Sequence, residues 1–290
     1  MTAMNFEPWV GSLGTFTLQG LRWGSHNAMQ TVVALHGWQD NAASFIPLAS
    51  ALSMHDSIEF IAIDLPGHGH SDAFPVTQGY SLWDYAQSII LWLNQLKQPV
   101  WLLGHSLGGM IAQIIASARP ELVKGLITLD ILSLSFDSTE GLSVQRMLEV
   151  LRALTMPKQH MYLSPNFDHA VARRARIGSP ASQAANVLLA QRGFVQSNQG
   201  WAPRLDPRVK AGGFMRLTPE GSDLLLNQIQ CPWHAILAKE GITSEKRQQE
   251  AKLLKPTLRI HMWPGGHHFH MEQNPVELLA LIINVMAGEV

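Results

Sequence analysis

The stretch that decides the fold reads Pro99-Val100-Trp101-Leu102-Leu103-Gly104-His105-Ser106-Leu107-Gly108, and Met110-Ile111-Ala112-Gln113-Ile114-Ile115-Ala116 follows it closely. The run before Gly104 is typical of a short buried strand, and the run after Gly108 has the apolar spacing of a helix. A Gly-x-Ser-x-Gly turn between a strand and a helix indicates a nucleophile elbow, in which a strained backbone exposes the serine hydroxyl. The five residues alone would fit a glycine-rich turn with an incidental serine equally well. With these flanks, the pattern predicts that Ser106 lies at the carboxyl end of a sheet, over a helix N-terminus that favours negative charge.

The composition is typical of a globular chain that builds a large core. The 290 residues are 46% hydrophobic and 15% charged, which fits one large α/β domain with an insertion, or two domains. The formal net charge of -1 excludes a general electrostatic attraction to nucleic acid. Cys231 is the only cysteine, so no intrachain disulfide can form and a reducing compartment is expected. We find neither a signal-peptide pattern nor an apolar run of transmembrane length, and therefore expect a cytoplasmic protein without a membrane or nucleic-acid partner.

Strand and helix patterns alternate through the first 130 residues. Strand patterns occur at 16–23, 31–35, 60–63, 99–103 and 126–129, and helical patterns at 42–54, 81–96 and 110–116. This alternation predicts an α/β fold with a mostly parallel, doubly wound sheet. Strand patterns return at 233–238 and 258–263, and a closing helix is expected at 275–286.

The alternation of strand and helix patterns stops between residues 131 and 230, where helical patterns dominate. We interpret this segment as a helical lid inserted into a core formed by residues 1–130 and 231–290. Arg173, Arg174 and Arg176 form a basic cluster, which we interpret as a solvated helix face. The apolar residues of this segment either line a pocket for an apolar acyl group or form the core of the lid itself. These residues are Met147, Leu151, Leu154, Met156 and Met161.

A serine hydroxyl is a poor nucleophile at neutral pH and needs an adjacent base. In folds built around such an elbow the partners follow in the order Ser, acid, His, so the histidine is expected in a loop after the last strand. His267 directly follows Gly265 and Gly266 in that loop, and we predict that it is the general base, with His268 and His270 as alternatives. The cluster would also fit a surface loop or a metal site. Because the chain has no His-Glu-x-x-His pattern and its lone cysteine has no partner, we expect no metal.

An acyl-transfer site also needs two fixed backbone N–H donors, because negative charge develops on the substrate oxygen in the transition state. One donor is expected from Leu107, the residue after the serine. The other is expected from Trp38, in the loop after the strand that ends at Leu35, although its indole would equally serve as a wall of the pocket.

Four motifs in order give the chain a resemblance to the α/β-hydrolase superfamily over nearly its whole length. They are His36-Gly37-Trp38, Asp64-Leu65-Pro66-Gly67-His68-Gly69-His70-Ser71, Gly104-His105-Ser106-Leu107-Gly108-Gly109, and Gly266-His267 with Glu272. The run His36-Gly37-Trp38-Gln39-Asp40-Asn41 most resembles serine-hydrolase-like proteins. The resemblance implies an α/β-hydrolase fold, esterase-type chemistry without a cofactor, and a mainly structural role for the loop from Asp64 to Ser71.

The acid is where the sequence departs from the family. The usual position is an aspartate after the strand that begins near Pro232, but Gly241 stands there, with Glu240 one residue earlier. The other position that the family uses, at the end of the strand after the elbow helix, is occupied by Asp130, as in haloalkane dehalogenases. Asp130 would otherwise cap the first lid helix, and Glu240 would otherwise be a solvated loop acid. We expect Asp130 to be the acid, with Glu240 as the alternative.

These residues together predict a serine hydrolase that cleaves a carboxylic ester of a small molecule through an acyl-enzyme. A thioesterase, a lactonase or a C–C bond hydrolase would use the same three residues. A haloalkane dehalogenase or an epoxide hydrolase needs an aspartate where Ser106 stands. A ligand-binding protein without activity is the alternative from another class, since one fold hosts both. The sequence leaves the natural substrate and the oligomeric state open.

Overall fold

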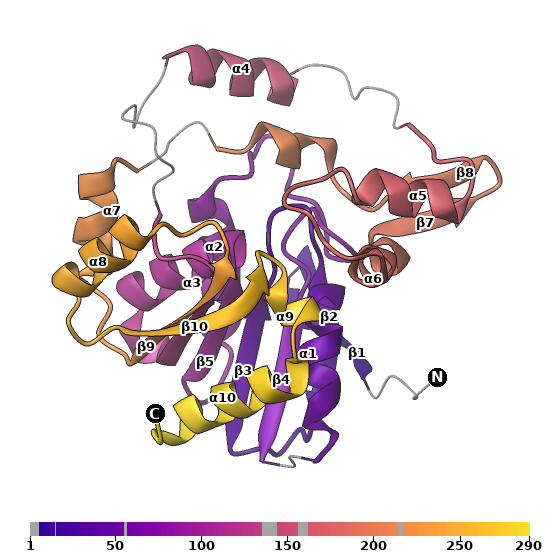
Figure 1. The fold of residues 1–290 in the computed structure, drawn as a ribbon. Coiled ribbons are helices and arrows are strands. Elements are labelled where there is room, and N and C mark those ends of the chain that lie inside the picture. The colour runs from indigo at the N-terminus through magenta and orange to yellow at the C-terminus, as the bar shows by residue number, and fades with distance from the viewer. Residues whose placement is uncertain (1–5, 15, 55–56, 135–143, 156–161, 214–216) are drawn as a thin grey trace.

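The computed structural model describes residues 6–14, 16–54, 57–134, 144–155, 162–213 and 217–290 (Figure 1). Its centre is an eight-stranded sheet in the spatial order β1-β2-β4-β3-β5-β6-β9-β10. The strands are β1 (Glu7–Leu13), β2 (Phe16–Gly24), β3 (Gln30–Leu35), β4 (Ile58–Ile63), β5 (Val100–His105), β6 (Val123–Leu129), β9 (Trp233–Glu240) and β10 (Arg259–Gly266). The six strands β4, β3, β5, β6, β9 and β10 are parallel to one another, and only the β1–β2 and β2–β4 pairs are antiparallel. The predicted α/β fold with a mostly parallel sheet is therefore confirmed.

Alternate residues of the central strands feed two hydrophobic cores, one on each face of the sheet. In β3, Val33 and Leu35 belong to one core, whereas Val32 and Ala34 belong to the other, as expected for a strand buried on both faces. The first core is covered by α2 (Leu82–Leu93), α3 (Leu107–Ala118), α7 (Pro219–Leu226) and α8 (Glu245–Leu254). The second is covered by η1 (Ala42–Phe45), α1 (Ile46–Ala49), η2 (Ser50–Met54), α9 (Phe269–Glu272) and α10 (Pro275–Ala287) (Figure 1).

A local signal accounts for the start of α2. Ser81 caps α2 through a reciprocal pair of bonds with Asp84, a capping box that satisfies two helix-end N–H groups. The helix ends at Leu93, before the expected end at residue 96. After α3, the short helix η3 (Pro120–Leu122) leads into β6.

The segment between β6 and β9 holds α4 (Val144–Thr155), α5 (Phe167–Arg174), α6 (Gln183–Gly193), η4 (Pro207–Ala211) and α7. It also contains an antiparallel hairpin of β7 (Phe194–Ser197) and β8 (Gly200–Pro203), which the sequence did not predict. Figure 1 shows α4, α5, α6 and the hairpin beyond the carboxyl ends of the parallel strands. By contrast, α7 packs against α3, and its Leu226 belongs to the first core. No helix in the described part of the chain has the length and apolar character needed to cross a membrane.

Candidate active site

Ser106 occupies a sharp turn between β5 and α3. Its backbone has φ 50° and ψ -115°, a conformation that costs energy for any residue with a Cβ. Glycine is needed on both sides of it. A Cβ on Gly104 would lie 2.4 Å from the Cα of Gly109, and one on Gly108 would lie 2.0 Å from the carbonyl oxygen of Leu35. The start of α3 is thereby packed directly onto the end of β3, which is the geometry of a nucleophile elbow.

His267 follows the last residue of β10 and lies against Asp130, the residue after β6. Its Nδ1 is 2.7 Å from Oδ2 of Asp130. An ionised carboxylate only accepts hydrogen bonds, so Nδ1–H donates, and the neutral imidazole keeps its lone pair on Nε2. Asp130 is fully buried, and its two oxygens also accept the backbone N–H groups of Ala238 (3.2 Å) and Ile242 (3.0 Å). The carboxylate therefore has a fixed position from which it orients the ring.

The surroundings of Gly241 explain why the acid stands at the end of β6. A Cβ on Gly241 would lie 2.1 Å from Oδ1 and 2.5 Å from Oδ2 of Asp130. The carboxylate of Asp130 thus fills the space in which a side chain at position 241 would begin. Glu240, the alternative acid, is exposed at the end of β9, and the structure brings Asp130, not Glu240, to His267.

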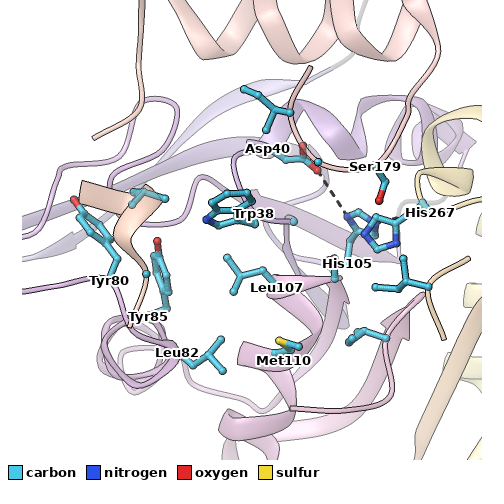
Figure 2. Close-up of a pocket in the computed structure, with 18 of the residues that line it drawn as sticks. Trp38, Asp40, Tyr80, Leu82, Tyr85, His105, Leu107, Met110, Ser179 and His267 are labelled. Carbon is cyan, nitrogen blue, oxygen red and sulfur yellow. Dashed lines mark hydrogen bonds and ion pairs between the residues drawn. The ribbon is translucent and has the colours of Figure 1, made fainter. Parts of the chain in front are cut away.

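Ser106 and His267 line one cavity of about 490 Å³. Figure 2 shows His267, Trp38 and Leu107 around it. Its apolar wall comes from both the core and the segment between β6 and β9. Those side chains include Leu82, Met110, Ile131, Leu134, Ile177 and Val209. Met147, Leu151 and Leu154, which were candidates for this wall, are not among its described lining residues, whereas Met156 and Met161 lie outside the described residues.

The two predicted oxyanion donors both border this cavity. Leu107 is the first residue of α3, so its N–H is one of the helix-end groups without a partner inside the helix. Trp38 lies in the loop after β3, and 45% of its surface is exposed. The contact between Gly108 and Leu35 holds the start of the helix against that strand end.

His268 and His270, the alternative bases, are buried away from Asp130. Nε2 of His268 lies 3.4 Å from Oδ2 of Asp40; burial lowers the pKa of His268, but the contact with Asp40 outweighs it and raises the pKa above its ordinary value. His270 is fully buried beside Phe45, and burial lowers its pKa to about 3. Neither ring contacts Asp130 among the hydrogen bonds and ion pairs of the described residues, so His267 is the ring that joins this carboxylate to the cavity.

His105, inside the Gly-x-Ser-x-Gly motif, holds the loop of His267. Its Nε2 lies 2.9 Å from the backbone oxygen of His267, to which it donates, and the two rings are 4.6 Å apart. Burial, together with the nearby His270, His267 and His268, lowers the pKa of His105 well below its usual value. This neutral ring therefore acts on the predicted base through the backbone.

One expectation was wrong: the basic cluster of α5 is not wholly a solvated face. Arg174 is buried, and its guanidinium pairs with Asp40, which lies in the loop after β3. Burial raises the pKa of Asp40, but the bond from His268 and the charge of Arg174 outweigh it and lower the pKa well below its ordinary value. A second ion pair of the same kind, 2.7 Å long, joins Arg192 of α6 to the buried Asp64. Two of the four motifs that carry the resemblance thus hold the inserted segment onto the core.

Asp40, His105 and His268 offer ligand atoms within 4.8 Å of one another, as a metal site would. Their donor chemistry argues against that use. Arg174 already balances the charge of Asp40, and a second cation would have to enter beside its guanidinium. No role was assigned to His105 or Asp40 from the sequence. Both lie in motifs that were singled out there, and a polar residue within such a motif was the available indication. Both side chains are buried in the structure.

The sheet order, the strained serine and the His–Asp pair define the class of the α/β hydrolases. Residues 30–156 match the family model of the alpha/beta hydrolase fold. A probable serine hydrolase of Drosophila melanogaster is 32% identical over 277 residues, which cover 88% of this chain and 80% of that protein. The chain therefore belongs to the serine-hydrolase-like members of the α/β-hydrolase family, and the predicted resemblance is confirmed.

Two further comparisons bear on fold and chemistry. The crystal structure of a hypothetical protein from Pseudomonas aeruginosa PAO1 superposes with a TM-score of 0.86 at 29% identity, covering 97% of this chain and 99% of that one. A pimeloyl-[acyl-carrier protein] methyl ester esterase of Shewanella woodyi is 41% identical over 100 residues, about a third of each chain (34% and 35%). Hydrolase chemistry is thus the common feature of the relatives whose activity is named.

Proposed function

We propose that the protein is a serine hydrolase that cleaves a carboxylic ester through an acyl-enzyme. One observation carries the proposal: the 2.7 Å contact between Asp130 and Nδ1 of His267 orients an imidazole in the wall of the cavity that Ser106 also lines. A carboxylate, an imidazole and a hydroxyl of this kind make a serine nucleophilic at neutral pH.

The proposed reaction has two halves. Oγ of Ser106 attacks the ester carbonyl while Nε2 of His267 takes the hydroxyl proton, and the tetrahedral intermediate expels the alcohol, which receives that proton. Water then gives a proton to His267 and attacks the acyl carbon, so that the carboxylic acid leaves and Ser106 regains its proton. Asp130 stays ionised throughout and stabilises the imidazolium that forms in each half.

The oxyanion of each tetrahedral intermediate is assigned to the backbone N–H groups of Leu107 and Trp38. Donors that are fixed before the reaction cost no reorganisation when charge develops, and losing one typically costs about 10²–10³-fold in rate. The loop of Trp38 is held by buried contacts: Nε2 of His36 accepts the N–H of Leu65 at 2.9 Å, and Asp40 pairs with Arg174.

The Shewanella relative, which is named as a methyl ester esterase, favours a carboxylic ester over a thioester, a lactone or a C–C bond. The apolar wall of the cavity suits an acyl chain. The two hydrolytic halves need no cofactor, because the nucleophile, the base and the oxyanion donors all come from the chain.

The experiment is labelling by a fluorophosphonate probe, together with hydrolysis of p-nitrophenyl butyrate. We expect the wild-type protein to be labelled and active, and Ser106→Ala to lose labelling and at least about 10³-fold in kcat. Ser197→Ala, which removes a hydroxyl from the β7–β8 hairpin, is the matched control and keeps both. A folded wild-type protein that is neither labelled nor active would refute the proposal and favour the ligand-binding alternative.

A further inference from the structure

A second cavity, of about 300 Å³, adjoins the one that contains Ser106. The two share four lining residues, Asp40, Arg174, Ile177 and Lys210. Most of its remaining wall comes from α5, α6, the β7–β8 hairpin and the chain that follows it. The second cavity therefore lies directly beside the first, with the Arg174–Asp40 pair at their common border.

The wall of the second cavity is cationic. Arg173 and Arg174 end α5, Arg204 follows β8, and Lys210 belongs to η4. The one described carboxylate in the wall is Asp40, which is already paired with Arg174.

The other three cations have no carboxylate partner among the described residues. The guanidinium of Arg173 donates instead to the backbone oxygen of Tyr162 and lies 5.6 Å from the centre of its ring. These contacts fix Arg173 in the wall and leave its charge uncompensated. Arg204 and Lys210 likewise form no ion pair with any carboxylate in the described part of the chain, so the cavity carries a surplus of positive charge that attracts anions.

Arg174 gives a second, independent sign that a ligand belongs here. Its side chain is only 5% exposed, and its Nε has no hydrogen-bond partner among the described residues. Buried polar groups are nearly always hydrogen-bonded, and an unpaired donor on a buried cation is costly. An acceptor supplied by a bound molecule would satisfy it.

The surplus belongs to the inserted segment and not to the chain as a whole. Residues 131–230 contain 11 Lys and Arg against seven Asp and Glu, whereas the rest of the chain contains 10 against 15. A protein that is nearly neutral overall thus concentrates positive charge beside its candidate active site.

We propose that the second cavity binds an anionic group of the substrate, so that the substrate is a small ester whose far end carries a carboxylate or a phosphate. The apolar wall near Ser106 contacts the chain that joins the two ends of the substrate. The anionic group at the far end is bound by Arg173, Arg174, Arg204 and Lys210. This inference rests on the proposed ester hydrolysis and adds the substrate class to it.

The test compares two esters that differ only in charge: the mono-p-nitrophenyl ester of suberic acid and its methyl-capped, neutral counterpart. We expect kcat/KM of wild type to favour the free carboxylate by about 10-fold or more, and this preference to shrink as NaCl screens the charges. Arg204→Gln and Lys210→Gln should each reduce the preference about 10-fold. Arg176→Gln removes an exposed charge near the end of α5 that lines neither cavity, and keeps the wild-type preference.

Competition tells the two anions apart. Inhibition of the neutral ester at constant ionic strength by suberate but not by inorganic phosphate assigns a carboxylate, and the reverse result assigns a phosphate. Equal kcat/KM for the two esters in wild type, or an equal preference in Arg204→Gln, Lys210→Gln and Arg176→Gln, overturns the inference while leaving ester hydrolysis intact. If neither ester is cleaved, the proposed function fails. The anion site is then decided by whether suberate or phosphate raises the Tm of wild type more than that of Lys210→Gln.

Discussion

The contact between Gly241 and Asp130 predicts that the acid can be moved from one strand end to another. The perturbation is the double variant Asp130→Gly with Gly241→Asp. The Cβ of a side chain at position 241 would start 2.1 Å from Oδ1 and 2.5 Å from Oδ2 of the present carboxylate. Gly241 is not among the described residues with positive φ, so an aspartate fits its backbone once Asp130 is gone. Its carboxylate would then occupy nearly the same space beside Nδ1 of His267.

The magnitude follows from two steps. Removing the acid with Asp130→Gly leaves the imidazole without its orienting partner, and a loss of about 10⁴-fold in kcat is expected. The relocated carboxylate approaches from β9 instead of β6 and lacks the two backbone donors placed for Asp130, Ala238 N–H and Ile242 N–H. A misplacement of about 1 Å costs about 10²-fold. The double variant should therefore be about 10²-fold below wild type and about 10²-fold above Asp130→Gly.

The assay is kcat for p-nitrophenyl butyrate, with Tm measured for every variant. Gly241→Asp alone forces two carboxylates into one space, so both kcat and Tm should fall. Glu240→Gln, next to the new acid but exposed, is the control and should stay within about twofold of wild type. The reasoning is refuted if the double variant folds with a Tm near that of wild type yet is no more active than Asp130→Gly.

Two further predictions concern stability and the oxyanion donor. Burial lowers the pKa of His270 from 6.5 to about 3, so below about pH 6.5 this residue binds a proton in the unfolded chain but not in the folded one. The folded protein therefore keeps its full free energy of unfolding above that pH and loses part of it as the pH falls toward 3. His270→Leu should therefore reduce the loss of unfolding free energy between pH 7.5 and pH 5, measured in urea, by about 2 kcal/mol, and an unchanged loss would contradict this. Gly108→Ala places a Cβ 2.0 Å from the oxygen of Leu35, which moves the start of α3 and with it the Leu107 N–H, so kcat should fall about 10²-fold. Gly79→Ala, whose Cβ meets nothing closer than 3.6 Å, should be nearly silent, and equal rates for the two alanine variants would rule the argument out.

The parts of this architecture that the sequence predicts are the ones specified by neighbouring residues. The apolar run of β5, the elbow and the helix of α3 are adjacent in the chain, and so are Gly265, Gly266 and His267. The strand β1 was not predicted, because it is an edge strand with a largely exposed face and few apolar residues in register. The β7–β8 hairpin was missed because its strands are only four residues long and its glycine and proline indicated breaks.

Contacts between residues that are distant in the chain could not be predicted from the sequence, because they form only when the chain has folded. Arg174 and Asp40 are 134 positions apart, and only the fold shows that one basic residue of a cluster turns inward while Arg176 remains exposed. The choice between Asp130 and Glu240 was open for the same reason. Spacing along the chain fits both, whereas the space beside Gly241 exists only after β6 and β9 have paired.

The fixed positions of the nucleophile and its acid come from the sheet and not from the inserted segment. Ser106 and Asp130 are two of the four described non-glycine residues with positive φ, and each directly follows a parallel strand. Each also adds one backbone hydrogen bond to the neighbouring strand. Ser106 N–H donates to the oxygen of Leu129 in β6 at 3.1 Å, and Asp130 N–H donates to the oxygen of Ile236 in β9 at 2.9 Å. Strain of this kind persists only where the surroundings fix it, and here consecutive strands do so. Substitutions in the cationic wall of the second cavity should therefore change which ester is preferred without moving the nucleophile or its acid.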